Sequence, residues 1–362
     1  MPAKRRARVA RGGAEFRIIA GLTRDLPAGR DVVVGPGDDA AVVRPAPGFD
    51  LVLTTDAFLE ERHWRSRWFG ASSLARRMPA AVGSRLVAAN LSDIAAMGAR
   101  ARWALLAAGI EKRGASWLAK VERSAAHALA REGAALTGGN LTRTRGASWL
   151  ILTLIGEVEP GRAWTRRGAK PGDLIAVTGT PGLAGAFVRL ADSRRPGGGL
   201  RGARDAIAEG WMNPPSRIAA ARALAATGGV TAAIDISDGL AGDLAHLCRS
   251  SGVGADLDSA ALEFGGALEA AAARLLPRGG SAATRARLAR ELALGPSDDY
   301  ELLLAVDAKL REACSAAAQA AGAPLTFIGT VTARAGELAL RPPDGSRAPL
   351  GGRGYDHFAA RS

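Results

Sequence analysis

Aspartate residues gather in five short clusters, each at a predicted strand end or turn. The clusters are Gly37-Asp38-Asp39, Thr54-Thr55-Asp56, Ser92-Asp93, Asp235-Ile236-Ser237-Asp238-Gly239 and Ser297-Asp298-Asp299. Carboxylate and hydroxyl oxygens are hard ligands, which Mg²⁺ prefers together with waters and substrate phosphates. Any single cluster can be a helix cap or an Asx-turn. Five clusters in one chain favour a site that binds Mg²⁺ with a phosphorylated substrate.

Glycine-rich stretches indicate where the backbone could approach a phosphate. No Gly-Lys dipeptide occurs, which excludes the Walker A loop of P-loop nucleotide-binding proteins. Residues 197–202 match G-x-G-x-x-G but follow a polar loop instead of a strand, so a linker is favoured. Residues 179–185 are compatible with an anion site or with a simple tight turn. Gly138-Gly139-Asn140 ends a predicted short strand and would let a ligand approach closely.

Histidine and cysteine spacing argues against several other chemistries. The histidines form no H-E-x-x-H pair, which argues against zinc, and no G-x-S-x-G elbow supports a serine hydrolase. His63 follows Asp56 closely enough in sequence to serve the same site. Cys248 and Cys314 form no C-x-x-C pair and no disulfide framework, so we expect a reducing, cytoplasmic environment.

The chain of 362 residues is 48% hydrophobic and 23% charged, a globular balance, and its net charge is +13. Its length and a polar, turn-rich stretch around 166–173 predict two domains, residues 1–160 and 161–362. No nucleic-acid-binding motif accompanies the positive charge, so binding to nucleic acid is not expected. The longest uncharged run, residues 314–333, is too polar to cross a membrane, and no apolar segment follows the basic residues near the N-terminus.

Apolar segments of strand length alternate with segments of helical periodicity, which favours an α/β or α+β fold. Predicted strands cover residues 51–55, 103–108, 148–158, 174–178, 232–236, 301–306, 327–331 and 337–340. Predicted helices cover residues 80–97, 116–132 and 215–226, with others after the turn at 179–182 and from residue 239. Several strand ends must therefore come together to position the aspartates.

A series of segments, in order along most of the chain, resembles the thiamine-monophosphate kinases of the aminoimidazole-ribotide synthetase-like superfamily. The segments are GPGDDAAVV (35–43), TTDAFLEERHW (54–64), NLSDIAAMGA (90–99), TGGNLTR (137–143), AWTRRGAKPGD (163–173), VTGTPG (177–182), IDISDGL (234–240), DDYELLL (298–304) and GYDHF (354–358). Each is weak alone. Their order indicates the superfamily, and the segments NLSDIAAMGA and GYDHF indicate the thiamine-monophosphate kinases within it.

The resemblance implies an ATP- and Mg²⁺-binding N-terminal domain whose sheet pairs in a homodimer, and an α/β C-terminal domain. It implies transfer of the ATP γ-phosphoryl group to thiamine monophosphate, without a catalytic base. The implied metal positions are Asp39, Thr54, Thr55, Asp56, Asp93, Asn140, Asp235 and Asp238. The implied ATP contacts are Gly139, Asn140, Arg166 and Ser237. The implied contacts to thiamine monophosphate are His63, Asp298 and Tyr355.

Three departures from the family pattern are visible. Asn140 stands where the family usually has aspartate, which removes a charge from one metal position. The family's Gly-Gly-Glu-Asp-Tyr stretch is Pro296-Ser297-Asp298-Asp299-Tyr300, and its Glu-Gly before the histidine is Glu61-Arg62. These changes are compatible with an adapted kinase or with a paralogue that acts on another phosphorylated metabolite.

Other members of the superfamily and a different class of protein stay as alternatives. Selenophosphate synthetase and the hydrogenase-maturation dehydratase rely on cysteines near a terminus, whereas the cysteines here lie at positions 248 and 314. The purine-biosynthetic synthetase has a Gly-Thr-Lys segment, to which only Gly83-Ser84-Arg85 is similar. A non-catalytic nucleotide-binding relative would bind ATP without turnover.

Overall fold

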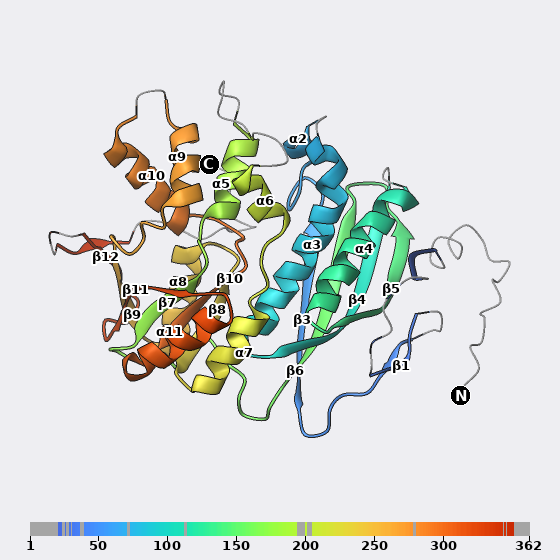
Figure 1. Ribbon diagram of the computed structural model, residues 1–362, viewed down its shortest axis with the longest axis horizontal. Coiled ribbons are helices and arrows are strands. Elements are labelled where there is room, and N and C mark those ends of the chain that lie inside the picture. Colours follow the sequence, from blue (N-terminus) through green and yellow to red (C-terminus); the bar gives the residue numbers. More distant parts are fainter. Residues whose placement is uncertain are drawn as a thin grey trace.

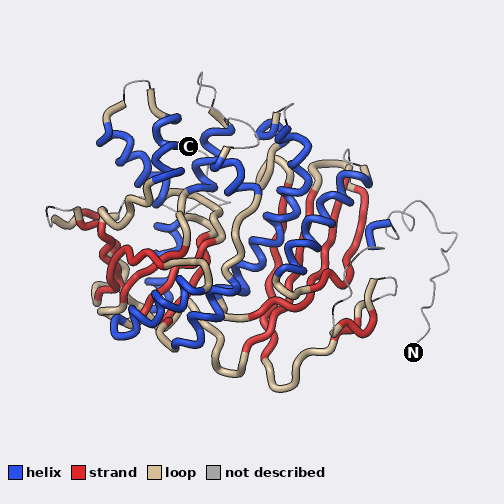
Figure 2. Tube along the Cα trace, viewed as in Figure 1, coloured by secondary structure: helices blue, strands red, loops and turns tan. Residues whose placement is uncertain are grey.

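The computed structural model describes two α/β units that pack side by side (Figures 1 and 2). The described residues are 21–23, 26, 29, 31–36, 40–70, 73–111, 114–193, 200, 205–277, 280–342, 344 and 346–350. Asp39 and Tyr355 therefore lie outside the described residues, as does most of the G-x-G-x-x-G match at 197–202.

The N-terminal unit is a four-stranded sheet with helices on one face. Its strands are β3 (Asp50–Leu59), β4 (Arg100–Ile110), β5 (Ala135–Arg143) and β6 (Trp149–Val158), and its helices are α2 (Ser66–Phe69), α3 (Ser73–Ala96) and α4 (Ala115–Arg131). The strand order is β3-β6-β4-β5, with only the β4–β5 pair parallel among these described strands. A two-stranded hairpin, β1 (Val32–Val34) and β2 (Val42–Val43), precedes the sheet.

The C-terminal unit is built on a seven-stranded mixed sheet in the order β13-β12-β9-β11-β7-β10-β8. Its strands are β7 (Leu174–Thr178), β8 (Val230–Ile236), β9 (Gly254–Asp258), β10 (Glu301–Val306), β11 (Leu325–Thr332), β12 (Leu338–Arg341) and β13 (Ala348–Pro349). Its helices are α5 (Leu183–Ala191), α6 (Ala206–Met212), α7 (Ile218–Thr227), α8 (Leu240–Ser251), α9 (Gly266–Leu275), α10 (Ala282–Leu294) and α11 (Arg311–Ala320), with a 3₁₀ turn η1 at Ala308–Leu310.

Helix α3 belongs to both units. It packs on β3 and β6 of its own sheet, and also against α6, α7, β8 and β10 of the C-terminal unit (Figure 1). Nearly every residue from Ala81 to Ala99 is buried, as expected for a helix that is apolar on all sides. Because α3 is held from both sides, side chains near its C-terminal end are fixed against both sheets.

The expected α/β class is confirmed, and the predicted strands 174–178 and 301–306 have the predicted bounds. Continuous apolar runs give this agreement: every residue of β10 is buried. Helix α3 begins at Ser73, seven residues before its predicted start, although Pro79 lies within it. The connection between the sheets, from Val158 to Leu174, contains residue 160, where we place the domain boundary.

The close crossing of α3 and α4 gives a stability prediction. A Cβ atom at Gly83 would lie 2.2 Å from the carbonyl oxygen of Val121, so Gly83→Ala must push the helices apart. We expect the free energy of unfolding to fall by about 1–3 kcal/mol in urea denaturation. The matched control is Gly210→Ala in α6, where the new methyl group meets open space. The control should gain roughly 0.5–1 kcal/mol, and equal effects of the two changes would contradict the crowding argument.

Candidate active site between the two units

Three buried or half-buried aspartates meet where β3, α3 and β8 come together. Thr54 donates a hydrogen bond from Oγ1 to Asp93 Oδ2 at 2.5 Å, which ties β3 to α3. Ser92 donates from Oγ to Asp235 Oδ2 at 2.8 Å, which ties α3 to β8. Asp56 lies two residues after Thr54 and therefore projects from the same face of β3. The adjacent pair Ser92 and Asp93 thus links both sheets to one acidic cluster.

Burial and mutual repulsion raise the pKa values of this acidic cluster. Burial and then the charge of Asp93 raise the pKa of Asp56 to about 7. Burial and then Asp93 raise the pKa of Asp235 to about 8, against the opposing hydrogen bond from Ser92. Burial also raises the pKa of Asp93, although Thr54 and Arg166 partly offset the effect. Ionised carboxylates at this point therefore need a positive partner.

The donor chemistry of the cluster fits a hard divalent cation. Asp56 Oδ2 is buried and has no hydrogen-bond partner, so one carboxylate oxygen is left for another ligand. Within the described ranges, no group of three or more His, Cys, Asp or Glu side chains converges closely enough to enclose an ion by itself. Mg²⁺ does not require such a cage, because it is usually held by one or two carboxylates, waters and substrate phosphates.

The loop after β8 carries two further candidates, Ser237 and Asp238. The carboxylate of Asp243, in the first turn of α8, accepts hydrogen bonds from the amides of Ser237, Asp238 and Gly239, each at 3.1 Å. Burial raises the pKa of Asp243 to about 7 despite these bonds. Asp243 therefore fixes the backbone of the loop that places Ser237 and Asp238 beside the acidic cluster.

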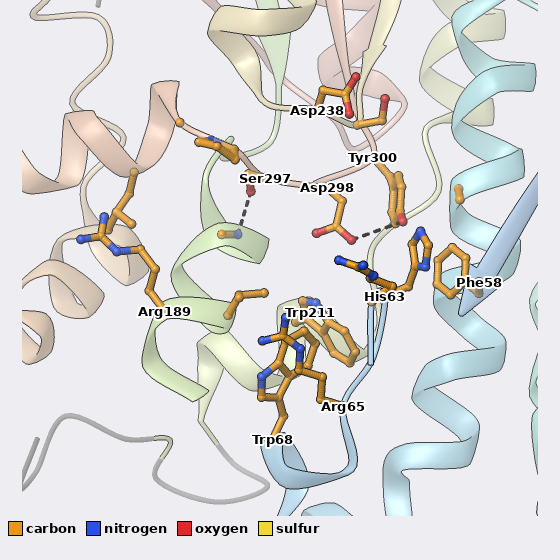
Figure 3. Close-up of a pocket in the computed structure, with 18 of the residues that line it drawn as sticks. Phe58, His63, Arg65, Trp68, Arg189, Trp211, Asp238, Ser297, Asp298 and Tyr300 are labelled. Carbon is orange, nitrogen blue, oxygen red and sulfur yellow. Dashed lines mark hydrogen bonds between the residues drawn. The ribbon is translucent and has the colours of Figure 1, made fainter. Parts of the chain in front are cut away.

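A cavity of ≈ 520 Å³ lies on one side of the cluster (Figure 3). Asp56, Ser237 and Asp238 line its acidic end. Its aromatic end is formed by side chains that pack on one another: Trp68 meets the Trp211 ring edge-on at 5.9 Å between centroids. In Figure 3, Asp298, Tyr300 and His63 lie between these two ends. Such a cavity suits an elongated ligand with a phosphate at one end and rings at the other.

His63 and the neighbouring arginines form the wall contributed by the N-terminal unit. His63 Nδ1 accepts a hydrogen bond from the amide of Leu59 at 2.9 Å, so the neutral ring carries its proton on Nε2. The imidazole also stacks on Phe58 with 5.0 Å between ring centroids. Arg62 and Arg65 line the same cavity. The wall therefore offers hydrogen-bond donors and positive charge.

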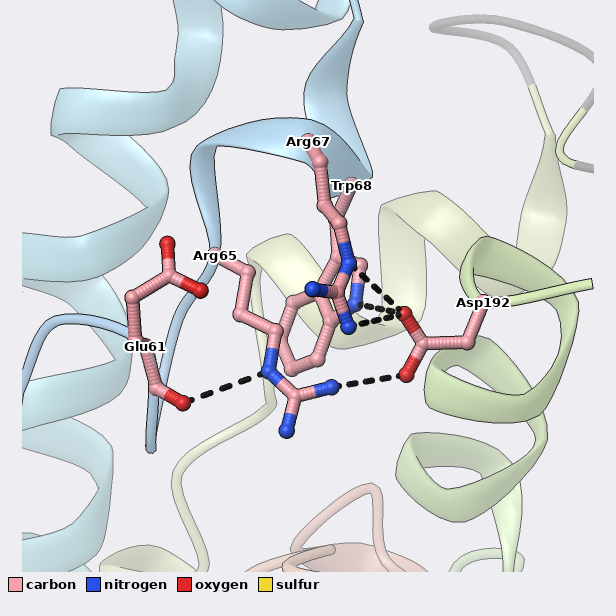
Figure 4. A network of polar contacts seen from close by, with 5 residues as sticks. All are labelled: Glu61, Arg65, Arg67, Trp68 and Asp192. Atoms are coloured by element: carbon pink, nitrogen blue, oxygen red, sulfur yellow. Dashed lines mark hydrogen bonds and ion pairs between the residues drawn. The ribbon is translucent and has the colours of Figure 1, made fainter.

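Asp192, which ends α5, attaches this wall to the C-terminal unit (Figure 4). Its carboxylate accepts from Arg65 at 2.8 Å, from Arg67 at 3.0 Å and from the indole of Trp68 at 2.8 Å. Burial alone would raise the pKa of Asp192, but the hydrogen bonds and the charges of Arg65 and Arg67 hold it below the usual value. One carboxylate thus fixes three residues at the rim of the cavity.

A smaller cavity of ≈ 230 Å³ lies against the same aspartates. Thr54, Asp93 and Asp235 line it, together with Arg166 from the connection between the sheets. Ser251 donates a hydrogen bond to the carbonyl oxygen of Arg166 at 2.9 Å, and Trp164 donates its amide to Met97 at 3.1 Å, which together fix that connection. The acidic cluster therefore faces two cavities, and an arginine accompanies it in the smaller one.

Family models for AIR synthase related proteins match most of the chain, the N-terminal domain at residues 37–158 and the C-terminal domain at 170–340. Thiamine-monophosphate kinase of Escherichia coli K12 is 35% identical over 346 residues, which span 95% of this chain and 98% of that relative. The corresponding kinase of Caulobacter vibrioides is 35% identical over 321 residues, or 87% and 83% of the two chains. This chain belongs to the thiamine-monophosphate kinase family.

Solved structures agree with membership of the thiamine-monophosphate kinase family. The kinase from Stenotrophomonas maltophilia K279a superposes with a TM-score of 0.72 at 33% identity, covering 92% of this chain and 96% of that one. The structure of AaThiL complexed with AMPPCP and TMP gives a TM-score of 0.68 at 25% identity, covering 87% and 89%. Hydrogenase maturation protein HypE from E. coli, at 20% identity and a TM-score of 0.70, shares the fold alone.

The structure brings together most, but not all, of the residues that the family resemblance implies. Thr54, Asp56, Asp93, Asp235 and Asp238 line the two cavities, with Arg166, Ser237, His63 and Asp298. Thr55 points to the other face of β3 and contacts Thr153 Oγ1 at 3.1 Å. Gly139 and Asn140 lie on β5, at the opposite edge of the sheet from β3.

The turn at residues 179–185 is not available to a phosphate. Asp299 accepts the amides of Gly182 at 2.6 Å and Ala184 at 2.9 Å, and Ser297 Oγ accepts the amide of Gly185 at 2.8 Å. Of the two interpretations that the sequence left open, the structural turn is correct. The anion at this helix N-terminus is a carboxylate of the chain itself.

Sequence reasoning missed Arg85, Asp243 and Trp211 as parts of this site. Arg85 is buried and contacts Asp298, and its signal was a basic residue inside a largely apolar helical segment. Asp243 stands five residues after Asp238 at the start of a predicted helix, which is a capping position with a visible signal. Trp211 carries no sequence signal, because only packing places its ring in the cavity.

The raised pKa values predict how pH affects the metal-free protein. Asp56 and Asp235 bind protons more tightly when folded, with pKa values of about 7 and about 8 against 3.8 in the unfolded chain. The free energy of unfolding should therefore fall as pH rises from about 4 to about 8, by at least about 1 kcal/mol, and excess Mg²⁺ should restore it. Urea denaturation at about pH 5 and pH 8, with chelator or Mg²⁺, measures both effects.

Asp235→Asn tests how much the acidic cluster contributes to the pH dependence of the free energy of unfolding. The variant should be more stable than wild type at pH 8 without metal and should gain less from Mg²⁺. Asp56, Asp243 and Glu122, whose pKa values burial also raises to about 7, supply the dependence that the variant retains. Identical pH profiles for wild type and Asp235→Asn would contradict the assignment.

Proposed function

We propose that this chain transfers the γ-phosphoryl group of ATP to thiamine monophosphate and produces thiamine diphosphate and ADP, in thiamine diphosphate biosynthesis. One observation carries the proposal: a single acidic cluster faces two cavities, so two phosphate-bearing molecules can meet over it. The elongated cavity accommodates a phosphate beside Asp56 and rings between His63 and Trp211. The kinase names of the relatives at 35% identity support the same activity.

The reaction requires little covalent help from the protein. A phosphate oxygen of thiamine monophosphate forms a bond to the γ-phosphorus, the bond from that phosphorus to the β–γ bridging oxygen breaks, and ADP leaves. The acceptor phosphate is largely ionised at neutral pH, because its second pKa is about 6, so no catalytic base is assigned. The residues of the site act by positioning and by balancing charge.

Several of the described residues have separate roles in this proposal. Thr54, Asp56, Asp93, Asp235 and Asp238 would hold Mg²⁺, with Asp39 outside the described residues. When bound, Mg²⁺ neutralises charge on the two phosphate groups. Arg166 and Ser237 contact ATP. His63 and Asp298, with Tyr355 outside the described part of the chain, contact thiamine monophosphate.

The position of Asn140 supports a homodimer. Three strand spacings separate β3 from β5, or roughly 14 Å, so Gly139 and Asn140 do not reach the acidic cluster of their own sheet. The face of this sheet away from the helices exposes Leu51, Leu53 and Leu105. A second copy, related by a two-fold axis along the strands, would cover these leucines and bring the partner's Asn140 toward β3. Thr55, on the same face, then lies in the interface.

The chain is proposed to work in the cytoplasm. Both cysteines, Cys248 and Cys314, are buried free thiols, which fits a reducing compartment. Across the described ranges, no helix is long and apolar enough to cross a membrane.

The activity is tested with purified protein, ATP, Mg²⁺ and thiamine monophosphate, scoring thiamine diphosphate and ADP. Equal amounts of both products are expected. Asp93→Asn should lower the rate at least about 100-fold, because the change removes a carboxylate that would hold the Mg²⁺ that neutralises charge on the transferring group. The control is Asp258→Asn, which should leave the rate unchanged. Among the bonds of the described residues, the exposed carboxylate of Asp258 accepts only the amide of Ala260, two residues away. ATP binding without products would favour a paralogue with another substrate or a non-catalytic relative.

The dimer is tested by changing the exposed face of the sheet. Leu53 is 66% exposed on that face, in the edge strand β3, and Leu53→Lys should convert a dimer into a monomer in light-scattering chromatography. The KM for ATP should rise about tenfold if the partner's Asn140 completes the site, which corresponds to about 1.4 kcal/mol. Ala316→Lys, on the exposed side of α11, is the control and should remain dimeric. A monomeric wild type with full activity would exclude this arrangement.

A further inference from the structure

Arg85 is a fully buried cation whose described contacts all cross from α3 to the C-terminal unit. Its side chain is 1% exposed. It donates to the carbonyl oxygen of Trp211 at 2.9 Å and to the carbonyl oxygen of Asp298 at 2.8 Å. It also pairs with the carboxylate of Asp298 at 2.5 Å. One guanidinium therefore contacts both the backbone and the side chain of residue 298.

Two aromatic rings hold the guanidinium in place. Its central carbon lies 4.5 Å from the ring centroid of Trp211 and 4.9 Å from that of Tyr300, within cation–π distance of both. Burial alone would lower the pKa of Arg85, but the charge of Asp298 holds it above the ordinary value, so the group stays cationic. A planar fork that both pairs and stacks has little freedom to move.

Asp298 is the one residue of its loop that faces the cavity with a carboxylate. Its neighbours Ser297 and Asp299 are bonded to the N-terminal turn of α5. The Asp298 carboxylate is 32% exposed, lines the cavity, and accepts from Tyr300 Oη at 3.5 Å (Figure 3). Tyr300 has a left-handed backbone with φ +59°, a strained conformation for a tyrosine. The loop is thus constrained so that Asp298 has one orientation, set by Arg85.

We propose that Arg85 is a positioning residue for the substrate: it aims the Asp298 carboxylate at the positively charged thiazolium ring of thiamine monophosphate. This inference rests on the proposed function. The thiazolium carries a permanent charge, and Asp298, beside Tyr300 and His63, lies between the acidic end and the aromatic end of the cavity, which Glu291 also lines. Arg85 itself lies beneath Asp298 and does not line the cavity, so it acts through Asp298.

The test compares Arg85→Lys, Asp298→Asn and the double variant. Lysine keeps the positive charge but lacks the planar guanidinium with its forked donors. Arg85→Lys therefore changes the geometry at residue 85 without changing its charge. Arg85→Lys should raise the KM for thiamine monophosphate about tenfold and leave the KM for ATP within about twofold. The double variant should have the same KM for thiamine monophosphate as Asp298→Asn alone. Once residue 298 is a neutral amide, its orientation no longer affects the attraction to the thiazolium. Additive effects would show that Arg85 does not act through Asp298.

A neutral substrate supplies a readout that a structural role would not change. In a thiamine monophosphate analogue whose thiazolium is replaced by an uncharged thiophene, the attraction to Asp298 is absent. Wild type and both single variants should then have similar KM values for the analogue. An equal rise in KM for the charged and the neutral substrate in the variants would overturn the proposal.

The control variant is Arg77→Lys, eight residues earlier on the same helix. Arg77 also joins the units, through an ion pair with Glu209 of α6 at 2.8 Å, but it does not line the cavity. It should leave both KM values unchanged. Thermal unfolding of all variants is measured in parallel, and a lower midpoint for Arg85→Lys with an unchanged KM would mean that Arg85 is only structural.

Failure of this inference can be told apart from failure of the proposed function. A wild type that makes thiamine diphosphate, with an unaffected Arg85→Lys variant, contradicts only the role of Arg85. A wild type without turnover contradicts the kinase function, and calorimetric binding of thiamine monophosphate then makes the same comparison between variants. If wild type neither turns over nor binds thiamine monophosphate, both proposals fail.

Discussion

The crowding of Asp56, Asp93 and Asp235 is the constraint on which the rest of this structure depends. Their carboxylates come from β3, α3 and β8. Burial raises the pKa of each, and the charge of Asp93 raises the pKa of Asp56 and of Asp235 further. A fold keeps such an unfavourable group only where surrounding contacts determine it. Here the contacts are the hydrogen bonds of Thr54 and Ser92, which tie the two sheets to one helix.

Helix α3 explains how two units share one site. The buried part of the helix, from Ala81 onward, is mostly apolar, and Arg85, Asn90 and Ser92 within it have specific hydrogen-bond partners. Arg85 contacts the loop at Asp298, while Ser92 and Asp93 contact both sheets. The helix therefore relates the substrate loop to the acidic cluster across two turns. A rigid connection of this kind suits a reaction that depends on positioning.

The sequence predicted the α/β class, the strands at 174–178 and 301–306, and most residues of the acidic cluster. These features depend on local patterns: apolar runs, and aspartates at their ends. Strand β9 was missed because Gly254 and two aspartates are poor strand formers, and only pairing with β11 and β12 makes it a strand. The separation of Asn140 from the cluster depends on strand order, and the partners of Arg85 lie 126 and 213 positions away. Neither the strand order nor these long-range contacts can be predicted from local sequence patterns.

The attachment of the 296–300 loop to α5 has an evolutionary consequence. Ser297 and Asp299 are fixed to the helix N-terminus on either side of residue 298, so the backbone between them does not depend on which side chain that residue carries. A lineage can therefore exchange residue 298 for another carboxylate without losing the loop, whereas a neutral residue there would leave the buried Arg85 without its ion-pair partner. The departure from glutamate to Asp298 in this chain is a small example of such an exchange.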